Sequence, residues 1–241
     1  PSYSNPGFDL IGSSALNIGG WLTVELFAEG AMRCLFSILF GAGVVLFTDT
    51  KAGWVHYKRT FWLLMFGFVN AYILVWSGDI LVVYAVAGAL LYLARNRSAK
   101  SLFTLAGILI LLMSLLHAMM AFGLGEAEKA HQRVVAAEAS GDEISKVDQE
   151  AAQSWLDFIS DFELNDSDVK AEIAARTDSY LSVFSWTAGQ NAEVYAFVLP
   201  VFLLWDALAM MMLGMALYKT GVLQATRSRA LYTKLMVVGI A

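Results

Sequence analysis

Apolar residues dominate the chain in long blocks that short polar segments separate. The blocks run for roughly 17–25 residues, the length that a helix needs to cross about 30 Å of hydrocarbon. They lack the period-2 alternation of barrel strands, so the pattern predicts helices. The predicted crossings cover about 26–47, 60–76, 79–94, 101–123 and 192–218, and a sixth begins at Leu235. The sequence therefore predicts an all-α, polytopic transmembrane helix bundle with five full crossings and a truncated sixth.

The segment 124–190 breaks this pattern because it is acidic, with 14 Asp and Glu residues against 5 Lys and Arg residues. Its apolar residues recur at helical spacing, and Ser145 followed by Asp148 has the spacing of a capping box. We therefore expect an insert of helices rather than a disordered loop, because disordered linkers contain few aromatic residues. The predicted domains are an N-terminal transmembrane bundle (1–123), the acidic insert (124–190) and a C-terminal transmembrane part (191–241).

Charge is segregated along the chain, which the net charge of −5 conceals. Ten of the 16 basic residues lie in three short loops, with Asp49 as the one acid among them. These loops are 48–59, 95–100 and 219–234. Basic loops stay in the cytoplasm, so we expect the insert 124–190 on the extracytoplasmic side.

Composition adds two limits. The chain is 58% hydrophobic, with a mean hydropathy of +0.60, against about 45–50% apolar residues in soluble domains. Cys34 is the one cysteine, so no internal disulfide can form, and no His/Cys cluster has metal-ligand spacing.

No initiator methionine or signal peptide opens the chain, and it stops inside an apolar run. We interpret it as an internal piece of a longer membrane protein.

Charged and polar residues inside the predicted crossings are the candidate functional residues, because a charge at mid-bilayer costs roughly 2.5–3.5 kcal/mol. Asp206 is nearest the middle, and the others gather in the outer half. We predict a pocket open to the outside, in which Arg33, Asn70 and Asp206 bind substrate and Asp79 or His117 moves a proton. The candidates considered are Glu25, Glu29, Arg33, Asn70, Asp79, His117, Glu193 and Asp206.

Each candidate also has a plainer interpretation. Arg33 can form a local ion pair with Glu25 or Glu29, which lie on the same helix face. His117 can be a structural, hydrogen-bonded histidine, and Asp79 can be a helix N-cap. Lys58 and Arg59 lie on the predicted inner side of the membrane, and two interpretations of them stay open. Lys58 and Arg59 are either a positive-inside anchor or a contact to phosphates of a nucleotide-like donor or a lipid head group. The Gly41-Ala-Gly43 step predicts close helix packing.

Three blocks resemble the YeiB-type bacterial membrane proteins, which carry a domain of unknown function numbered 418. They are Leu35-Phe-Ser-Ile-Leu-Phe-Gly-Ala-Gly43, Lys58-Arg59 leading to Gly67-Phe-Val-Asn-Ala-Tyr72, and Gly78-Asp-Ile-Leu81 with Tyr84. The stretch Leu213–Leu223 is similar to the C-terminal domain of that family. The family usually has His at the position of Asn70, and its opening helix is absent here.

The resemblance implies a multi-pass protein of the bacterial inner membrane. Because the family is grouped distantly with transmembrane acyltransferases, it also implies acyl transfer to an extracytoplasmic acceptor, with acyl-CoA as the donor. Two alternatives stay open: a transporter of a small, anionic solute, and a membrane scaffold without a ligand. The expected partners are the lipid bilayer and a small-molecule or lipid-linked substrate, and we expect no nucleic acid and no metal. Neither the substrate nor the oligomeric state follows from the sequence.

Overall fold

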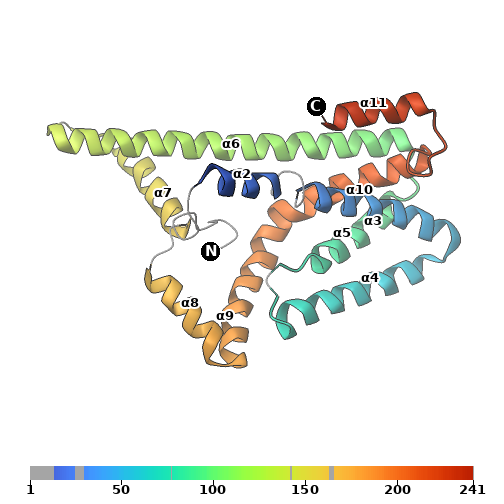
Figure 1. The fold of residues 1–241 in the computed structure, drawn as a ribbon, viewed down its shortest axis with the longest axis horizontal. Helices are drawn as coiled ribbons and strands as arrows, with labels where there is room; N and C mark the ends of the chain where they lie inside the picture. Colours follow the sequence, from blue (N-terminus) through green and yellow to red (C-terminus); the bar gives the residue numbers. More distant parts are fainter. Residues whose placement is uncertain (1–13, 25–29, 77, 142, 163–165, 241) are drawn as a thin grey trace. The chain divides into compact units, whose positions relative to one another are not determined.

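The structure is a computed structural model, and it describes residues 14–24, 30–76, 78–141, 143–162 and 166–240. All regular elements within these ranges are helices, which confirms the predicted all-α class (Figure 1). The chain divides into two compact units. Unit 1 comprises Pro1–Thr23 and Leu112–Ser179, and unit 2 comprises Val24–Leu111 and Tyr180–Ala241.

Unit 1 contains helix α2 (Ala15–Thr23), the later part of α6 (Ala99–Ser140), α7 (Lys146–Phe162) and α8 (Asp166–Asp178). The predicted cap is present: Ser145 Oγ accepts the Asp148 N–H at 3.1 Å and donates to the Asp148 carboxylate at 2.9 Å. Arg133 on α6 pairs with the same carboxylate at 2.5 Å, so α6 and α7 are tied together at their connection. The hydrogen bond from Arg133 has the largest effect on the pKa of the Asp148 carboxyl, which it lowers, and the hydrogen bond from Ser145 lowers it further. The described parts of the acidic segment are therefore mainly helical, as its periodicity predicts.

Unit 2 holds a helix bundle whose members pack around one apolar core. Its helices are α3 (Gly30–Thr50), α4 (Gly53–Phe68), η2 (Val69–Ile73), α5 (Leu81–Ala94), α9 (Tyr180–Glu193), η3 (Val194–Leu203), α10 (Leu204–Lys219) and α11 (Arg229–Ile240), and α6 begins in it. The core side chains Val44, Leu91, Met211 and Met215 are fully buried. They come from α3, α5 and α10, which places these helices at the centre of the unit.

Helices α3 and α10 touch through their backbones at two glycines. A Cβ atom on Gly41 would lie 1.9 Å from the carbonyl oxygen of Met211, and one on Gly214 would lie 1.9 Å from that of Ile38. Neither position can carry a side chain unless a helix moves. A Cβ on Gly43 would meet nothing within 4 Å. The close packing predicted for the Gly41-Ala-Gly43 step is therefore confirmed, and Gly41 is the residue that permits it.

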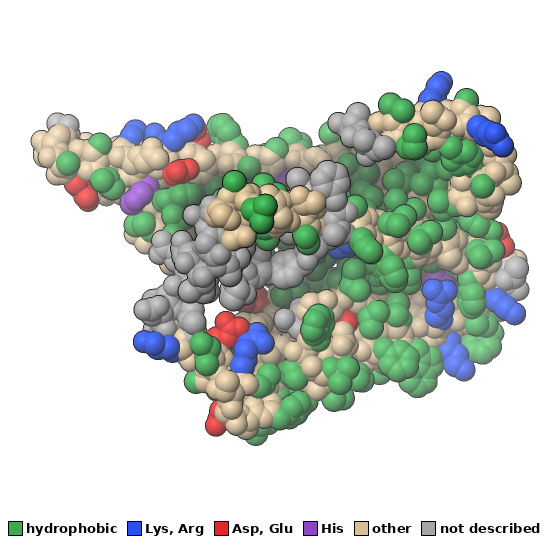
Figure 2. Space-filling view, viewed as in Figure 1, with side chains coloured by type: hydrophobic (Ala, Val, Ile, Leu, Met, Phe, Trp, Pro, Cys, Tyr) green, Lys and Arg blue, Asp and Glu red, His purple; other side chains and the backbone are tan. Residues whose placement is uncertain are grey.

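Within the described residues, three helical stretches are long and apolar enough to cross a membrane: Gly30–Asp49, Ala99–Ser140 and Tyr180–Lys219. Leu81–Ala94 is a shorter apolar helix. Large apolar side chains lie exposed along α4, among them Phe61, Trp62 and Phe66, as expected for a lipid-facing surface. Figure 2 shows hydrophobic side chains over much of the face in view. These features fit a membrane protein, while the five full crossings stay a prediction.

Two π-helical stretches lie within the described residues of unit 2. The stretch η2 continues α4, and η3 joins α9 to α10 and contains Pro200. Proline has no N–H to donate inside a helix, so a helix that contains one must depart from regular α geometry nearby. Short π-helical turns are frequently found at functional sites. The stretch η3 contributes Val194 and Leu203 to the wall of the pocket described below, and Asn70 of η2 contacts the lining residue Asp79.

Candidate functional site

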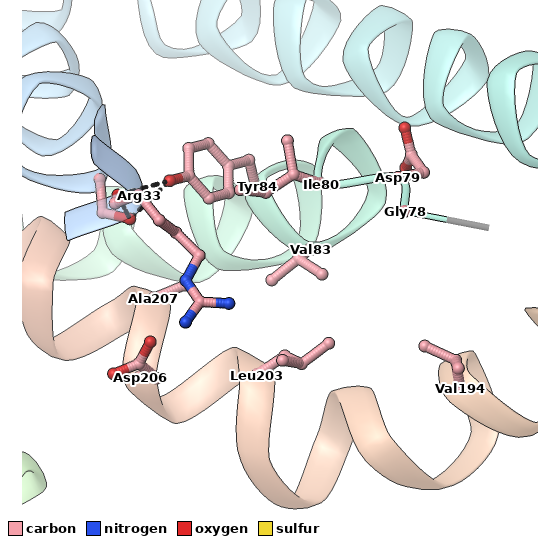
Figure 3. Close-up of a pocket in the computed structure, with 11 residues that line it drawn as sticks. Arg33, Gly78, Asp79, Ile80, Val83, Tyr84, Val194, Leu203, Asp206 and Ala207 are labelled. Carbon is pink, nitrogen blue, oxygen red and sulfur yellow. Dashed lines mark hydrogen bonds between the residues drawn. The ribbon is translucent and has the colours of Figure 1, made fainter. Parts of the chain in front are cut away.

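A pocket of about 230 Å³ opens in unit 2. Its walls come from α3, from the start of α5 with the three residues before it, from η3 and from α10. The residues that line it are Arg33, Ser37, Gly78, Asp79, Ile80, Val83, Tyr84, Val194, Leu203, Asp206 and Ala207 (Figure 3). Three of the residues predicted from the sequence, Arg33, Asp79 and Asp206, thus share one pocket.

Arg33 supplies the positive charge of the pocket. In Figure 3 its guanidinium extends from α3 toward α10, the helix that carries Asp206. Both side chains are exposed to the pocket, and within the described residues neither forms an ion pair at 4.0 Å or closer. The predicted local partners of Arg33, Glu25 and Glu29, lie outside the described residues. The pocket therefore presents a cation and a carboxylate on facing helices.

Two buried hydroxyl groups fix the backbone of Arg33. Ser37 Oγ donates to the Arg33 carbonyl at 3.0 Å and shares a 2.5 Å hydrogen bond with Tyr84 Oη. Ser37 and Tyr84 are 3% and 2% exposed, so the bond between α3 and α5 is shielded from solvent. Rings of Phe36 and Phe40 pack against Tyr84, with centroids 5.7 and 5.3 Å away. The hydrogen bond between Ser37 and Tyr84 therefore holds α3 against α5 close to Arg33.

Asp79 joins η2 to the start of α5. Its Oδ1 accepts from Asn70 Nδ2 at 2.9 Å, and its Oδ2 accepts from the Val82 N–H at 2.9 Å. The second bond caps an N–H in the first turn of α5, as the N-cap interpretation predicts, although Asp79 lies one residue before the N-cap position, which Ile80 occupies. In Figure 3 the carboxylate points away from the middle of the pocket. The structure therefore brings Asn70 and Asp79 into contact. Asn70 does not line the pocket, and its hydrogen bond holds Asp79 in the pocket wall.

The sequence did not predict the polar contacts between α9 and η2. Asn191, 2% exposed, donates to the Ala71 carbonyl at 2.8 Å, and Tyr180 Oη donates to the Ile73 carbonyl at 2.7 Å. Both carbonyls belong to η2. Thr187 lies one turn before Asn191, and its Oγ1 is buried without a hydrogen-bond partner in the described part of the chain. The spacing of Thr187 and Asn191, four residues apart just before an apolar run, is the signal that could have revealed these contacts.

The other predicted residues lie elsewhere. Lys58 Nζ stands 5.7 Å from the Trp54 ring, and the Arg59 guanidinium lies 5.5 Å from Phe40 and 5.4 Å from Phe47. Neither lines the pocket, and these ring contacts fit an anchor at the membrane surface. His117 belongs to unit 1, where its Nδ1 lies 2.7 Å from the Met113 carbonyl. Its expected place beside the other four residues stays a prediction.

Two curated proteins are similar to this chain, and both are uncharacterised. YeiB from Escherichia coli (strain K12) is 33% identical over 97 residues, which cover 39% of this chain and 24% of YeiB. YxaH from Bacillus subtilis (strain 168) is 30% identical over 128 residues, which cover 47% of this chain and 32% of YxaH. These matches confirm the resemblance to YeiB-type proteins, and they span about a quarter of YeiB and about a third of YxaH. No protein-family model and no solved structure matches.

Proposed function

We propose that unit 2 carries the binding pocket of a membrane transporter for a small solute with an anionic group. The observation that carries this proposal is the Arg33 guanidinium, which faces the pocket without an ion pair among the described residues. A charge in a membrane-embedded site needs a counter-charge, and a bound anion supplies one. Guanidinium groups bind carboxylates and phosphates well because they offer paired donors in a planar fork.

A π-helical stretch forms part of the pocket wall. Such stretches are frequent at functional sites, and η3, which lies within the continuous helix Tyr180–Lys219, supplies the wall residues Val194 and Leu203. Acyl transfer from acyl-CoA instead requires a cavity that reaches the basic side of the membrane near Lys58 and Arg59, and neither residue lines this pocket. A scaffold without a ligand requires Arg33 to be paired within the protein.

Ligand binding by the purified full chain in phosphatidylcholine nanodiscs tests the proposal. The probes are acetate, 4-methylpentanoate and inorganic phosphate, with affinities measured by titration calorimetry. Arg33→Gln should weaken binding of the best probe about 10- to 100-fold, because a hydrogen bond to a charged group contributes about 1.5–3 kcal/mol and 1.4 kcal/mol is a factor of ten.

Arg97→Gln, in an exposed loop, is the matched control and should bind like the unchanged protein. Glu29→Gln separates the pocket from a local ion pair. If Glu29→Gln and Arg33→Gln lower the amount of folded protein equally and no probe binds, Arg33 is a structural partner and the proposal is wrong.

The same proposal includes a topology. We infer a bacterial inner-membrane protein with five full crossings and residues 124–190 outside, as the basic loops predict. Ser98→Cys and Ser140→Cys, each made in a Cys34→Ser background, place one thiol on each predicted side, and both positions are exposed. A membrane-impermeant maleimide should label Ser140→Cys in intact cells and Ser98→Cys only after permeabilisation. The reverse pattern would invert the assigned orientation.

A further inference from the structure

The positions of Arg33 and Asp206 follow from the glycine contact between α3 and α10. Arg33 precedes Gly41 by eight residues, and Asp206 precedes Gly214 by eight residues. Each side chain therefore lies about 12 Å along its helix from the contact, at 1.5 Å per residue. Because both also line one pocket, the two helices run in the same direction through this contact and separate toward their N-terminal ends. The opposite charges thus occupy equivalent places on the two sides of the opening.

The pocket combines this pair of charges with an apolar surface. Val83 of α5 and Ile80 just before that helix line one side, and Leu203 and Val194 line another from η3. In Figure 3 the side chains of Val83, Leu203 and Val194 lie beyond the guanidinium, on the side away from Asp206. A ligand that fills the pocket therefore meets the Arg33 and Asp206 charges at one end and mainly hydrocarbon at the other, where the Asp79 carboxylate points away from the middle of the pocket.

A ligand with an anionic group alone would match only one of the two charges in this pocket. It would compensate Arg33 but would lie close to the Asp206 carboxylate, which repels it in a medium of low dielectric constant. A ligand with both an anionic and an ammonium group compensates both side chains at once. The volume of about 230 Å³ is below the range of roughly 300–1,000 Å³ for pockets that hold drug-sized ligands, so the ligand is small.

We propose that the pocket selects a zwitterion with a short apolar body, whose anionic group binds Arg33 and whose ammonium group binds Asp206. This inference rests on the proposed solute-binding function and specifies its substrate class. Two sources carry this chemistry: a free apolar amino acid, and the head group of phosphatidylethanolamine with the first part of its chains.

Three matched probes separate the two charges: L-leucine carries both, 4-methylpentanoate lacks the ammonium group, and 3-methylbutylamine lacks the carboxylate. Their affinities for the full chain in phosphatidylcholine nanodiscs are measured by titration calorimetry. Leucine should bind about tenfold or more tightly than either partial probe, the difference expected for one charged hydrogen bond. Asp206→Asn should remove this advantage by weakening leucine binding while leaving 4-methylpentanoate binding unchanged or stronger.

A separate measurement tests whether the zwitterion is a lipid head group. Phosphatidylethanolamine in the nanodiscs should raise the unfolding temperature of the unchanged protein, but not of Asp206→Asn, if the head group is the zwitterion. If 4-methylpentanoate binds as tightly as leucine, or Asp206→Asn weakens both equally, the zwitterion inference is wrong while the anion pocket stands. If no probe binds and neither lipid nor Arg33→Gln changes anything, the proposed function fails as well.

Discussion

Replacing Gly41 with valine should destabilise the protein by about 3 kcal/mol or more and sharply reduce the amount that accumulates in the membrane. A Cβ at this position would lie 1.9 Å from the Met211 carbonyl oxygen and 2.7 Å from the Met211 Cα atom. The obstacle is backbone, which cannot turn aside as a side chain can, so α3 and α10 must move apart. Overpacking a well-packed core typically costs 1–3 kcal/mol even where side chains can adjust. Thermal unfolding in detergent measures the effect.

Gly43→Ala is the matched control, two residues along the same helix. A Cβ there meets nothing within 4 Å, and alanine favours a helix over glycine by roughly 0.5–1 kcal/mol. This variant should unfold at the same temperature or slightly higher. Equal destabilisation by both substitutions would mean that α3 tolerates no change at all, and that the contact with α10 is not the cause.

Asp79→Ala should lower the stability by about 2–4 kcal/mol, while Asp79→Asn should stay within about 1 kcal/mol of the unchanged protein. Alanine removes the cap on the Val82 N–H, which contributes about 0.5–2 kcal/mol, and leaves the Asn70 amide without its acceptor, which costs about 1–3 kcal/mol. Asparagine caps helices as well as aspartate does, and Asn70 can turn its amide to bond with it. Thermal unfolding separates the two variants.

The same pair of variants tests the proton-transfer hypothesis for Asp79. An asparagine cannot exchange a proton at neutral pH, so Asp79→Asn would stop proton-coupled transport in a protein that still folds. Asp49→Ala, at the exposed end of α3, is the control and should change neither property. If Asp79→Asn transports normally and only Asp79→Ala fails, Asp79 is a cap and nothing more.

The sequence predicts the residues of the pocket better than it predicts their partners. Arg33 and Asp206 stand out because a charge inside an apolar block is costly and therefore needs a reason. Ser37 and Tyr84 give no such signal, because a serine and a tyrosine are ordinary in a membrane helix. Their importance lies in a contact across 47 positions of the chain, which no local spacing encodes. The same holds for Asn191 and the Ala71 carbonyl, 120 positions apart.

The π-helical stretches show a second limit. An α-helix and a π-helix differ by one residue in hydrogen-bond reach, and the apolar pattern over 60–76 looks the same for both. Only Pro200 marks its stretch in the sequence, because proline disturbs a regular helix. The predicted crossing of 60–76 therefore anticipates a helix there, but neither the end of α4 at Phe68 nor the change of geometry that follows it.

That change of geometry affects how relatives of this chain should be compared. A π turn holds one more residue than an α turn, so a relative that lacks one residue within 69–73 can continue as a plain α-helix. The wider π turn absorbs the extra residue, so the residues on either side keep the directions that they would have in a plain α-helix. The same extra residue in a regular α-helix would rotate everything after it by about 100°, the angle per residue at 3.6 residues per turn. An asparagine and an aspartate aligned with Asn70 and Asp79 can therefore keep their contact in a relative whose spacing is one residue shorter, and an alignment of this region should allow a one-residue gap within 69–73.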